Sequence, residues 1–188
     1  ENNKINYNFS GKWKVVFNPG QLDEYNAIGL FNQKNSKISG TFQTTTGDYG
    51  FMEGVSEENS LMLSTFNGAR SYLFKGQIHD NIIKGYFYRG NYNKIPFIAY
   101  RDDNFILPDP NSLTVISDQY NKFEFSFEDG EGRTISDDDP IFHNKVLVVQ
   151  IMGTWCPNCL DETAFISEFI NENNYNDLKF VSLAFEYV

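Results

Sequence analysis

Two cysteines, Cys156 and Cys159, are the residues of this chain whose type and spacing best suit covalent chemistry. They stand three positions apart, directly after an apolar segment and at the start of a helical pattern. A cysteine at a helix N-terminus faces free N–H groups and the helix dipole, which favour the thiolate that attacks disulfides. The second cysteine lies about one helical turn further on, close enough to attack a mixed disulfide on the first. The spacing therefore predicts thiol–disulfide exchange.

Three neighbours of the cysteines are candidate site residues. Trp155 supplies a flat apolar wall beside the sulfur, and Pro157 suits the first helical turn because its missing N–H would be unpaired there. We assign both residues to substrate binding. Glu162 follows Cys159 by three residues, so it lies on a similar helical face and could accept or return the Cys159 proton. An ordinary first-turn glutamate, stabilised by the helix dipole, explains Glu162 equally well.

Other uses of the two cysteines fit less well. A structural disulfide that closes so short a loop would stabilise the fold by only about 2 kcal/mol. A zinc site needs about four ligands, and the two histidines, His79 and His143, lie in other predicted segments. We therefore expect no metal and no cofactor. A copper-handling thiol site remains an alternative, because Cu(I) prefers thiolate ligands.

Charge and hydropathy limit the partners and the compartment. The net charge of −10 repels phosphate backbones, so no nucleic-acid partner is expected. No apolar run approaches the roughly 20 residues of a membrane-spanning helix. A single close pair of cysteines is compatible with an oxidising compartment. The carboxylates of Asp137-Asp138-Asp139 suggest calcium, but a solvated acidic loop is the favoured interpretation.

The first half of the chain is a series of short expected strands. Turn signals separate them, among them Asn67-Gly68, in which both residues tolerate positive φ. The regular spacing of roughly 8–12 residues favours an antiparallel barrel or sandwich. The expected strands are Trp13–Phe17, Ala27–Gln33, Ile38–Thr44, Gly50–Val55, Leu61–Phe66, Ser71–Ile78, Ile82–Tyr88 and Ile95–Arg101.

The pattern changes at Leu107-Pro108-Asp109-Pro110, where two prolines favour extended chain. We expect an all-β antiparallel domain over residues 1–106, a linker over 107–119 and a second domain over 120–188. Strand, helix and strand in the second domain predict a right-handed βαβ unit with a parallel sheet. Its expected elements are a hairpin of Phe123–Phe127 and Arg133–Ser136, strand Val146–Met152, helix Pro157–Asn171 and strand Leu178–Val188.

The segment from Gly153 to Cys159, followed by Glu162, resembles the active site of the TlpA/ResA-type thioredoxin-like proteins of the bacterial envelope. Their common pattern is W-C-x-x-C-x-x-E, and the preceding hairpin with its lead into Lys145–Ile151 is similar too. The resemblance covers about residues 120–188. It implies that Cys156 is the nucleophile, that Cys159 resolves the mixed disulfide and that Glu162 aids proton transfer.

The resemblance also implies a fold and a setting. The expected fold class is a two-domain α+β protein, in which an antiparallel β-barrel or sandwich precedes the first half of a thioredoxin-like α/β domain. The implied enzyme is a thiol–disulfide oxidoreductase, and its partner is a protein that carries cysteines, as substrate or redox partner. The implied location is periplasmic, or lipid-anchored through residues not present here. The thioredoxin fold also has further strands and a cis-proline loop, and the sequence up to Val188 does not contain them. We therefore expect weak activity from this chain alone.

A binding protein is the rival interpretation. The β domain makes up more than half of the chain and would bind a ligand or partner, with the redox segment in a subsidiary role. The 18 phenylalanines and 11 tyrosines permit such a role. A packed barrel core accounts for the same aromatic residues.

Overall fold

The computed structural model describes residues 7–68, 70–91, 93–173 and 175–186. They belong to two compact units, Glu1–Leu113 and Thr114–Val188. Each unit has its own sheets, so the two are described separately.

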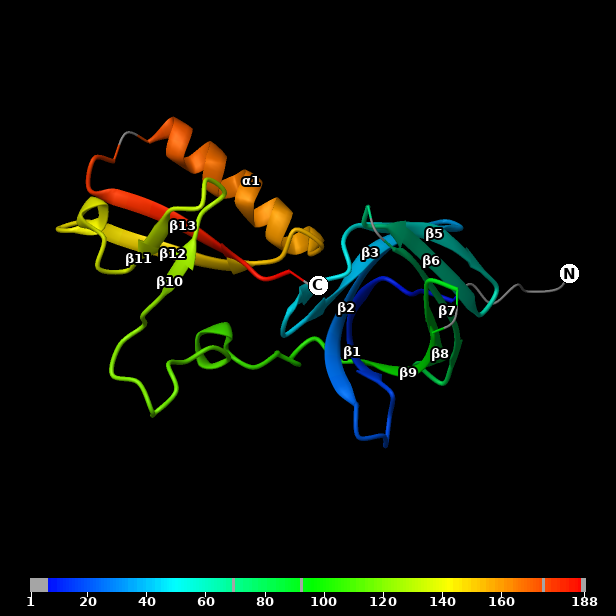
Figure 1. The fold of residues 1–188 in the computed structure, drawn as a ribbon. Coiled ribbons are helices and arrows are strands. Elements are labelled where there is room, and N and C mark those ends of the chain that lie inside the picture. Colours follow the sequence, from blue (N-terminus) through cyan, green and yellow to red (C-terminus); the bar gives the residue numbers. More distant parts are fainter. Residues whose placement is uncertain (1–6, 69, 92, 174, 187–188) are drawn as a thin grey trace, which may run out of the picture. The chain divides into compact units, whose positions relative to one another are not determined.

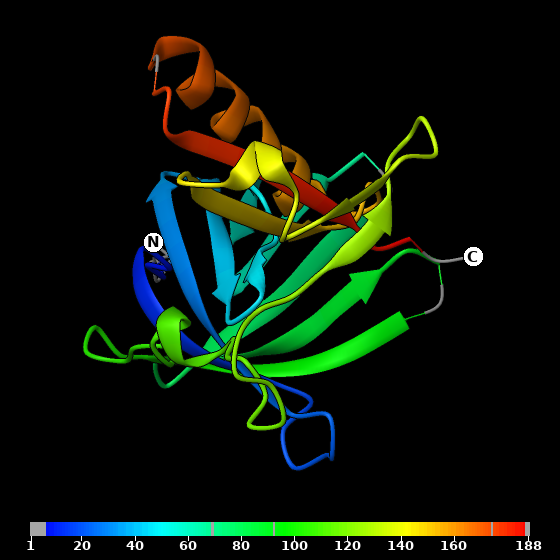
Figure 2. The ribbon, with the colours of Figure 1, turned by 60° about the vertical axis from the view of Figure 1, so that its left-hand side comes forward.

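The first unit is a closed antiparallel barrel of eight strands, coloured blue to green in Figure 1 and in the turned view of Figure 2. Each barrel strand pairs with its neighbours in the chain, and the first strand also pairs with the last, which closes the wall. A two-residue strand, β4 (Gly47–Asp48), pairs with β3. The eight strands are β1 (Gly11–Phe17), β2 (Tyr25–Lys34), β3 (Lys37–Thr44), β5 (Met52–Glu57), β6 (Ser60–Phe66), β7 (Ser71–His79), β8 (Ile82–Arg89) and β9 (Asn93–Arg101).

Alternation along the strands explains why this sequence forms a barrel. In β1 the side chains of Trp13, Val15 and Phe17 are completely buried, while the residues between them are partly exposed. A period of two places every second side chain inside the wall. The pairing of β1 with β9 closes the wall, so of the predicted barrel and sandwich the barrel is correct.

Aromatic side chains fill the interior of the barrel. The Phe74 ring stacks on Phe42 and on Phe87, with ring centroids 4.3 Å apart in each pair. The buried indole N–H of Trp13 donates to the Phe9 carbonyl oxygen at 2.9 Å, so its polar atom is satisfied. An eight-stranded barrel is just wide enough for side chains to fill it. The interior is a packed core, and packing accounts for much of the aromatic content.

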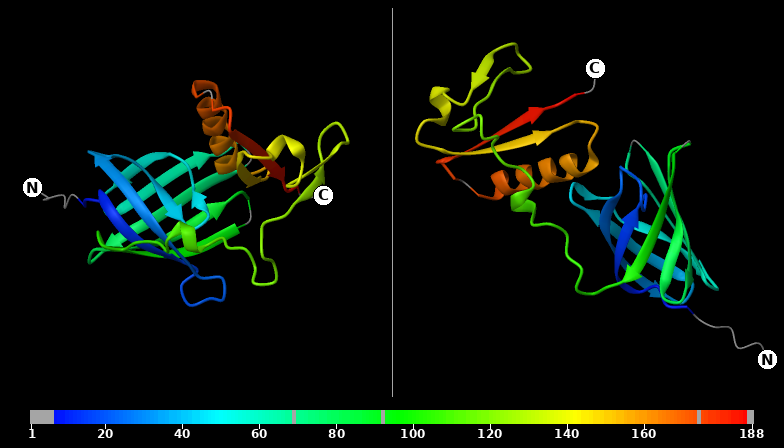
Figure 3. Two further views of the ribbon diagram at one scale, coloured as in Figure 1. Left: turned by 90° about the vertical axis from the view of Figure 1, so that its left-hand side faces the viewer. Right: turned by 90° about the horizontal axis from the view of Figure 1, so that it is seen from below.

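The second unit is built around a parallel pair of strands, β12 (Val146–Met152) and β13 (Leu178–Ala184), connected by the helix α1 (Pro157–Glu172). A separate hairpin consists of β10 (Ser126–Glu128) and β11 (Thr134–Ser136). Figure 3 shows α1 running along one side of β12 and β13. The described chain also has two short 3-10 helices, η1 (Pro110–Ser112) and η2 (Pro140–Phe142).

The predicted α+β fold class with a partial thioredoxin-like α/β domain is wrong. The chain is mostly β, and α1 is the only α-helix among the described residues. The parallel sheet has two strands, and the hairpin forms its own sheet and does not join it. The strand, helix and strand pattern specifies a local βαβ unit. This pattern does not reveal how many further strands join the sheet. That number distinguishes a thioredoxin-like domain from a two-strand βαβ unit.

The elements of the second unit lie close to their predicted positions, but several of their apolar side chains are exposed to solvent. The helix ends at Glu172 in place of Asn171, and the last strand ends at Ala184. The last two residues of its predicted range, 187–188, lie outside the described residues. Two apolar side chains of β12, Val146 and Ile151, remain 60% and 62% exposed. No helix in the described part of the chain is long and apolar enough to cross a membrane.

Candidate functional site

Cys156 and Cys159 are joined by a disulfide at the start of α1, with their Cα atoms 5.3 Å apart. Cys156 is the N-cap residue in extended conformation, and Pro157 takes the first helical position. The Cys159 N–H donates to Cys156 Sγ at 3.4 Å. The first sulfur therefore lies at the positive end of the helix, where a thiolate formed on reduction would be stabilised.

Trp155 packs back over Gly153 at the end of β12. A Cβ atom at Gly153 would come within 2.5 Å of the indole ring, so a side chain at this position would displace the indole. The indole N–H donates to the Phe185 carbonyl oxygen at 3.0 Å, which ties the cysteine loop to the chain after β13. Trp155 is 44% exposed and keeps a surface that an approaching peptide can contact.

A carboxylate from the segment after β13 holds the other side of this loop. The backbone N–H and the hydroxyl of Thr154 both donate to Glu186, each at 2.9 Å. The Phe185 N–H donates to the Met152 carbonyl oxygen at 2.6 Å. The loop that carries the first cysteine is thus anchored at two points.

Gln150 is a buried polar residue in the middle of β12 and the hub of a hydrogen-bond network. Its Nε2 donates to the Cys159 carbonyl oxygen at 3.2 Å and to Glu162 Oε2 at 3.1 Å. Its Oε1 accepts from the Ser182 hydroxyl at 3.0 Å. The Thr163 hydroxyl donates to the Cys159 carbonyl oxygen at 2.7 Å. One amide therefore links both strands to the first two turns of the helix.

The network brings Glu162 and Cys159 together, because both accept from the same amide nitrogen. Sequence reasoning proposed Glu162 from helical spacing and missed Gln150. The available signal was a single polar residue inside the apolar run from Val146 to Met152. A buried polar side chain must find hydrogen-bond partners, and those of Gln150 lie at the site.

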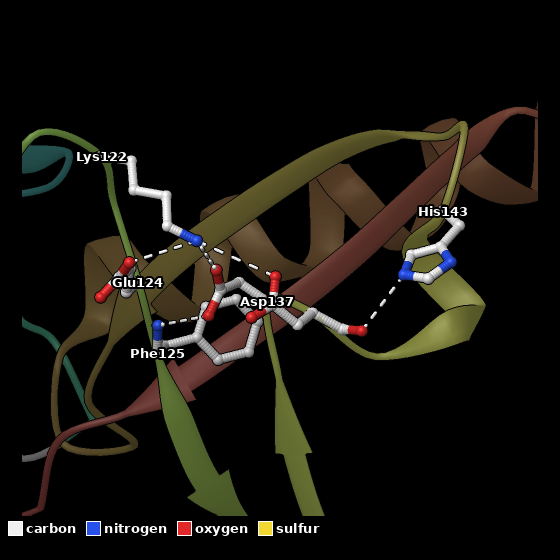
Figure 4. Close-up of polar contacts among 6 residues, drawn as sticks. Lys122, Glu124, Phe125, Asp137 and His143 are labelled. Atoms are coloured by element: carbon white, nitrogen blue, oxygen red, sulfur yellow. Dashed lines mark hydrogen bonds and ion pairs between the residues drawn. The ribbon is translucent and has the colours of Figure 1, made fainter.

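The acidic segment before η2 is organised by backbone contacts. The Asp137 carboxylate accepts from the Phe125 N–H at 3.1 Å and lies 3.3 Å from Lys122 Nζ, as Figure 4 shows. The hydrogen bond from the Phe125 N–H, followed by the contacts with Lys122, lowers the pKa of Asp137. Lys122 also lies 3.2 Å from the Glu124 carboxylate. The contacts with Asp137 join the segment before β10 to the segment after β11.

The remaining candidate ligands are dispersed. Asp139 caps η2 by accepting from the Ile141 N–H at 3.1 Å. His143 Nε2 lies 3.2 Å from the Asp138 carbonyl oxygen, and His79 contacts a barrel asparagine. Within the described ranges, no three histidine, cysteine, aspartate or glutamate side chains gather in a group that could hold a metal ion.

Comparison with known proteins gives no family assignment. No protein-family model matches the sequence, and no curated protein is significantly similar to it. The function is therefore argued from the site.

Proposed function

We propose that this chain is a thiol–disulfide oxidoreductase that exchanges two electrons with cysteines of a partner protein through Cys156 and Cys159. The observation that supports this most strongly is the disulfide at the helix start, with Cys156 as the N-cap residue. Both cysteines are partly exposed, so a partner thiolate can reach them. The W-C-x-x-C-x-x-E motif supports a relation to TlpA/ResA-type proteins and a place in the bacterial envelope.

The reaction is written from the disulfide form. A partner thiolate attacks Cys156 Sγ, the bond between Cys156 and Cys159 breaks, and Cys159 leaves as a thiolate that takes up a proton. A second partner thiolate then attacks the partner sulfur of the mixed disulfide and releases Cys156 as a thiolate. The partner dithiol loses two electrons and becomes a disulfide, while the two site cysteines gain them. The reverse sequence reduces a partner disulfide.

Glu162 is the group proposed to give the proton to the leaving Cys159 thiolate and to take it back in the reverse direction. Its carboxylate shares the Gln150 amide with the Cys159 backbone, which fixes it on the side of the helix that carries this cysteine. Gln150 is proposed as a positioning residue. It holds the Glu162 carboxylate and the Cys159 backbone in place while the Cys159 sulfur forms or breaks its disulfide bond.

A trapping experiment tests the proposal. After mixing with a disulfide-containing peptide, a Cys159→Ser variant should accumulate a mixed disulfide on Cys156, because the resolving sulfur is missing. The matched Cys156→Ser variant should accumulate much less, because Cys159 lies inside the first helical turn. Mass spectrometry locates the adduct. Equal trapping on either cysteine, or none on both, would refute the assigned roles.

A further inference from the structure

The outer face of the barrel carries a groove of about 610 Å³ across strands β5 to β9. This volume lies in the range of small-molecule sites. Buried aromatic and aliphatic side chains pack the barrel interior, whereas this groove lies on the outer face of the wall. The groove is independent of the cysteine site, since every residue that lines it belongs to the first unit.

The walls of the groove are apolar. Met62 and Tyr86 face outward on β6 and β8 and remain 40% and 44% exposed. Val55, Pro96 and Ile98 continue the same surface on the flanking strands. The outward residues of β5 and β6 form one apolar strip and those of β8 and β9 form a second, with β7 between them. Exposed apolar surface of this kind marks a binding site.

Two lysines project into this apolar surface. Lys75 on β7 pairs with Tyr86, and Lys84 on β8 pairs with Gln77, so the two lysines occupy diagonal positions on adjacent strands. Cβ atoms in this relation are roughly 7 Å apart. Among the described residues, none of the ion pairs involves either lysine. Two neighbouring ammonium groups repel each other, and an anion bound between them removes the repulsion.

Other charges around the groove agree with an anionic ligand. Lys94 Nζ lies 3.9 Å from the centroid of the Tyr86 ring, which brings a third ammonium group to the edge. Glu57, which also lines the groove, lies on β5, and β6 separates it from β7. Two strand spacings, about 10 Å, therefore lie between Glu57 and the strand of Lys75. This local excess of positive charge occurs on a chain of net charge −10.

We infer that the outer groove binds a small amphipathic anion, with its charged head between Lys75 and Lys84 and its apolar body against Met62 and Tyr86. A carboxylate head accepts hydrogen bonds from both ammonium groups. An aliphatic or aromatic body covers the exposed walls and gains the free energy of removing them from water. Neither half of the ligand is sufficient alone, because the head is solvated in water and the walls are shallow.

Calorimetric titration of the full chain with decanoate tests the inference, with decan-1-ol and acetate as the tail and the head alone. We expect saturable binding of decanoate at one site and binding at least about tenfold weaker for each partial probe. The Lys75→Gln/Lys84→Gln variant should bind decanoate about tenfold more weakly. Lys84→Gln alone should weaken it severalfold, whereas Lys34→Gln, a matched exposed lysine on β2, should not.

A second variant tests the apolar wall. Met62→Asp places a negative charge in the groove and should abolish decanoate binding, while circular dichroism shows whether the barrel remains folded. The inference is overturned if decanoate does not bind saturably, or if the double lysine variant binds it as tightly as Lys34→Gln does. It is also overturned if the protein binds anionic phospholipid vesicles but not free decanoate.

Discussion

The buried amide of Gln150 donates to Glu162 Oε2 at 3.1 Å, and the same nitrogen donates to the Cys159 carbonyl oxygen at 3.2 Å. A strand residue thus holds both the resolving cysteine and the carboxylate proposed to serve it. The two groups are fixed through the backbone and the strand, so their relation does not depend on a flexible side-chain contact between them.

Gln150→Leu should disturb the site and the fold of the second unit together. Leucine removes the hydrogen bonds that the Gln150 amide makes to Ser182, the Cys159 carbonyl oxygen and Glu162, each of which contributes about 0.5–1.5 kcal/mol. Hydrogen exchange over residues 146–173 should become faster in this variant. Ser182→Ala, which removes only one donor of the network, should have a smaller effect. If Gln150 positions Glu162, the pH dependence of thiol exchange should also shift in Gln150→Leu and stay unchanged in Ser182→Ala.

Glu162→Gln should lower the apparent pKa of the reduced cysteine pair and slow the exchange. The variant removes a negative charge that opposes thiolate formation, and it removes a proton acceptor. The two cysteines titrate together, so the shift belongs to the pair. A pH–rate profile of exchange with a small disulfide measures it. Asp161→Asn, the neighbouring carboxylate, is the control, and an identical change in both variants would assign the effect to general charge.

Reduced Cys156 should react with maleimide faster than Cys159 near neutral pH. The N-cap position exposes Cys156 Sγ to the free N–H groups of the helix start, and the thiolate is the reactive form. Peptide mapping after brief labelling gives the two rates. Faster labelling of Cys159 would reverse the proposed roles of nucleophile and resolving cysteine.

The barrel should lose stability at alkaline pH through a partly buried pair of tyrosines. Tyr25 and Tyr49 hydroxyls are 2.8 Å apart, and burial raises the pKa of both phenols above the ordinary value of 10.0. Below pH 10 the phenols are neutral in both states, and their contribution to stability is complete. Above it the unfolded chain ionises first, so the free energy of unfolding falls as the pH rises. Because both phenols are partly exposed and screened by solvent, the fall is smaller than the limit of about 1.4 kcal/mol per pH unit for each phenol.

Urea unfolding between pH 8 and about pH 11 measures this alkaline loss. The decline should be shallower in Tyr25→Phe, because one of the two hydrogen-bonded phenols is gone. Tyr120→Phe changes an exposed tyrosine of the second unit and should leave the decline of barrel stability unaltered. An equal decline in all three proteins would show that the tyrosine pair makes no special contribution.

Gly85→Ala should destabilise the barrel by about 1–3 kcal/mol. A Cβ atom at Gly85 would run into the backbone carbonyl oxygen of Lys75 on the neighbouring strand, so β7 and β8 would have to separate. Gly130→Ala introduces a methyl group into open space and serves as the control. Thermal unfolding followed by near-ultraviolet circular dichroism, which reports the aromatic core, distinguishes the two.

Local patterns predicted the elements well. The predicted strand Trp13–Phe17 lies within β1, and the helix predicted to begin at Pro157 begins there. Such features depend on residues close together in the sequence, so they can be predicted from it. The two-residue strand β4 was missed because it is too short to show alternation.

The thioredoxin-like domain was predicted wrongly because a βαβ segment and a cysteine motif are both local. The number of strands that join a sheet depends on distant pairings that no spacing reveals. Gln150 was missed for a similar reason. Its role depends on contacts with Glu162 on α1 and Ser182 on β13. These contacts form only when the helix and the second strand pack against β12.

The closure of the barrel also determines when it can fold during synthesis. Trp13 to Phe17 on β1 pair with Arg101 to Phe97 on β9, and the Arg101 guanidinium donates to the Ser10 carbonyl oxygen at 2.6 Å. The wall can therefore not be completed until Arg101 has left the ribosome. Until then one edge of β1 has no hydrogen-bonded neighbour, and its apolar face is not yet covered by the rest of the barrel. A nascent chain that stops short of β9 thus exposes an aggregation-prone edge, and a chaperone that shields β1 would act in that interval.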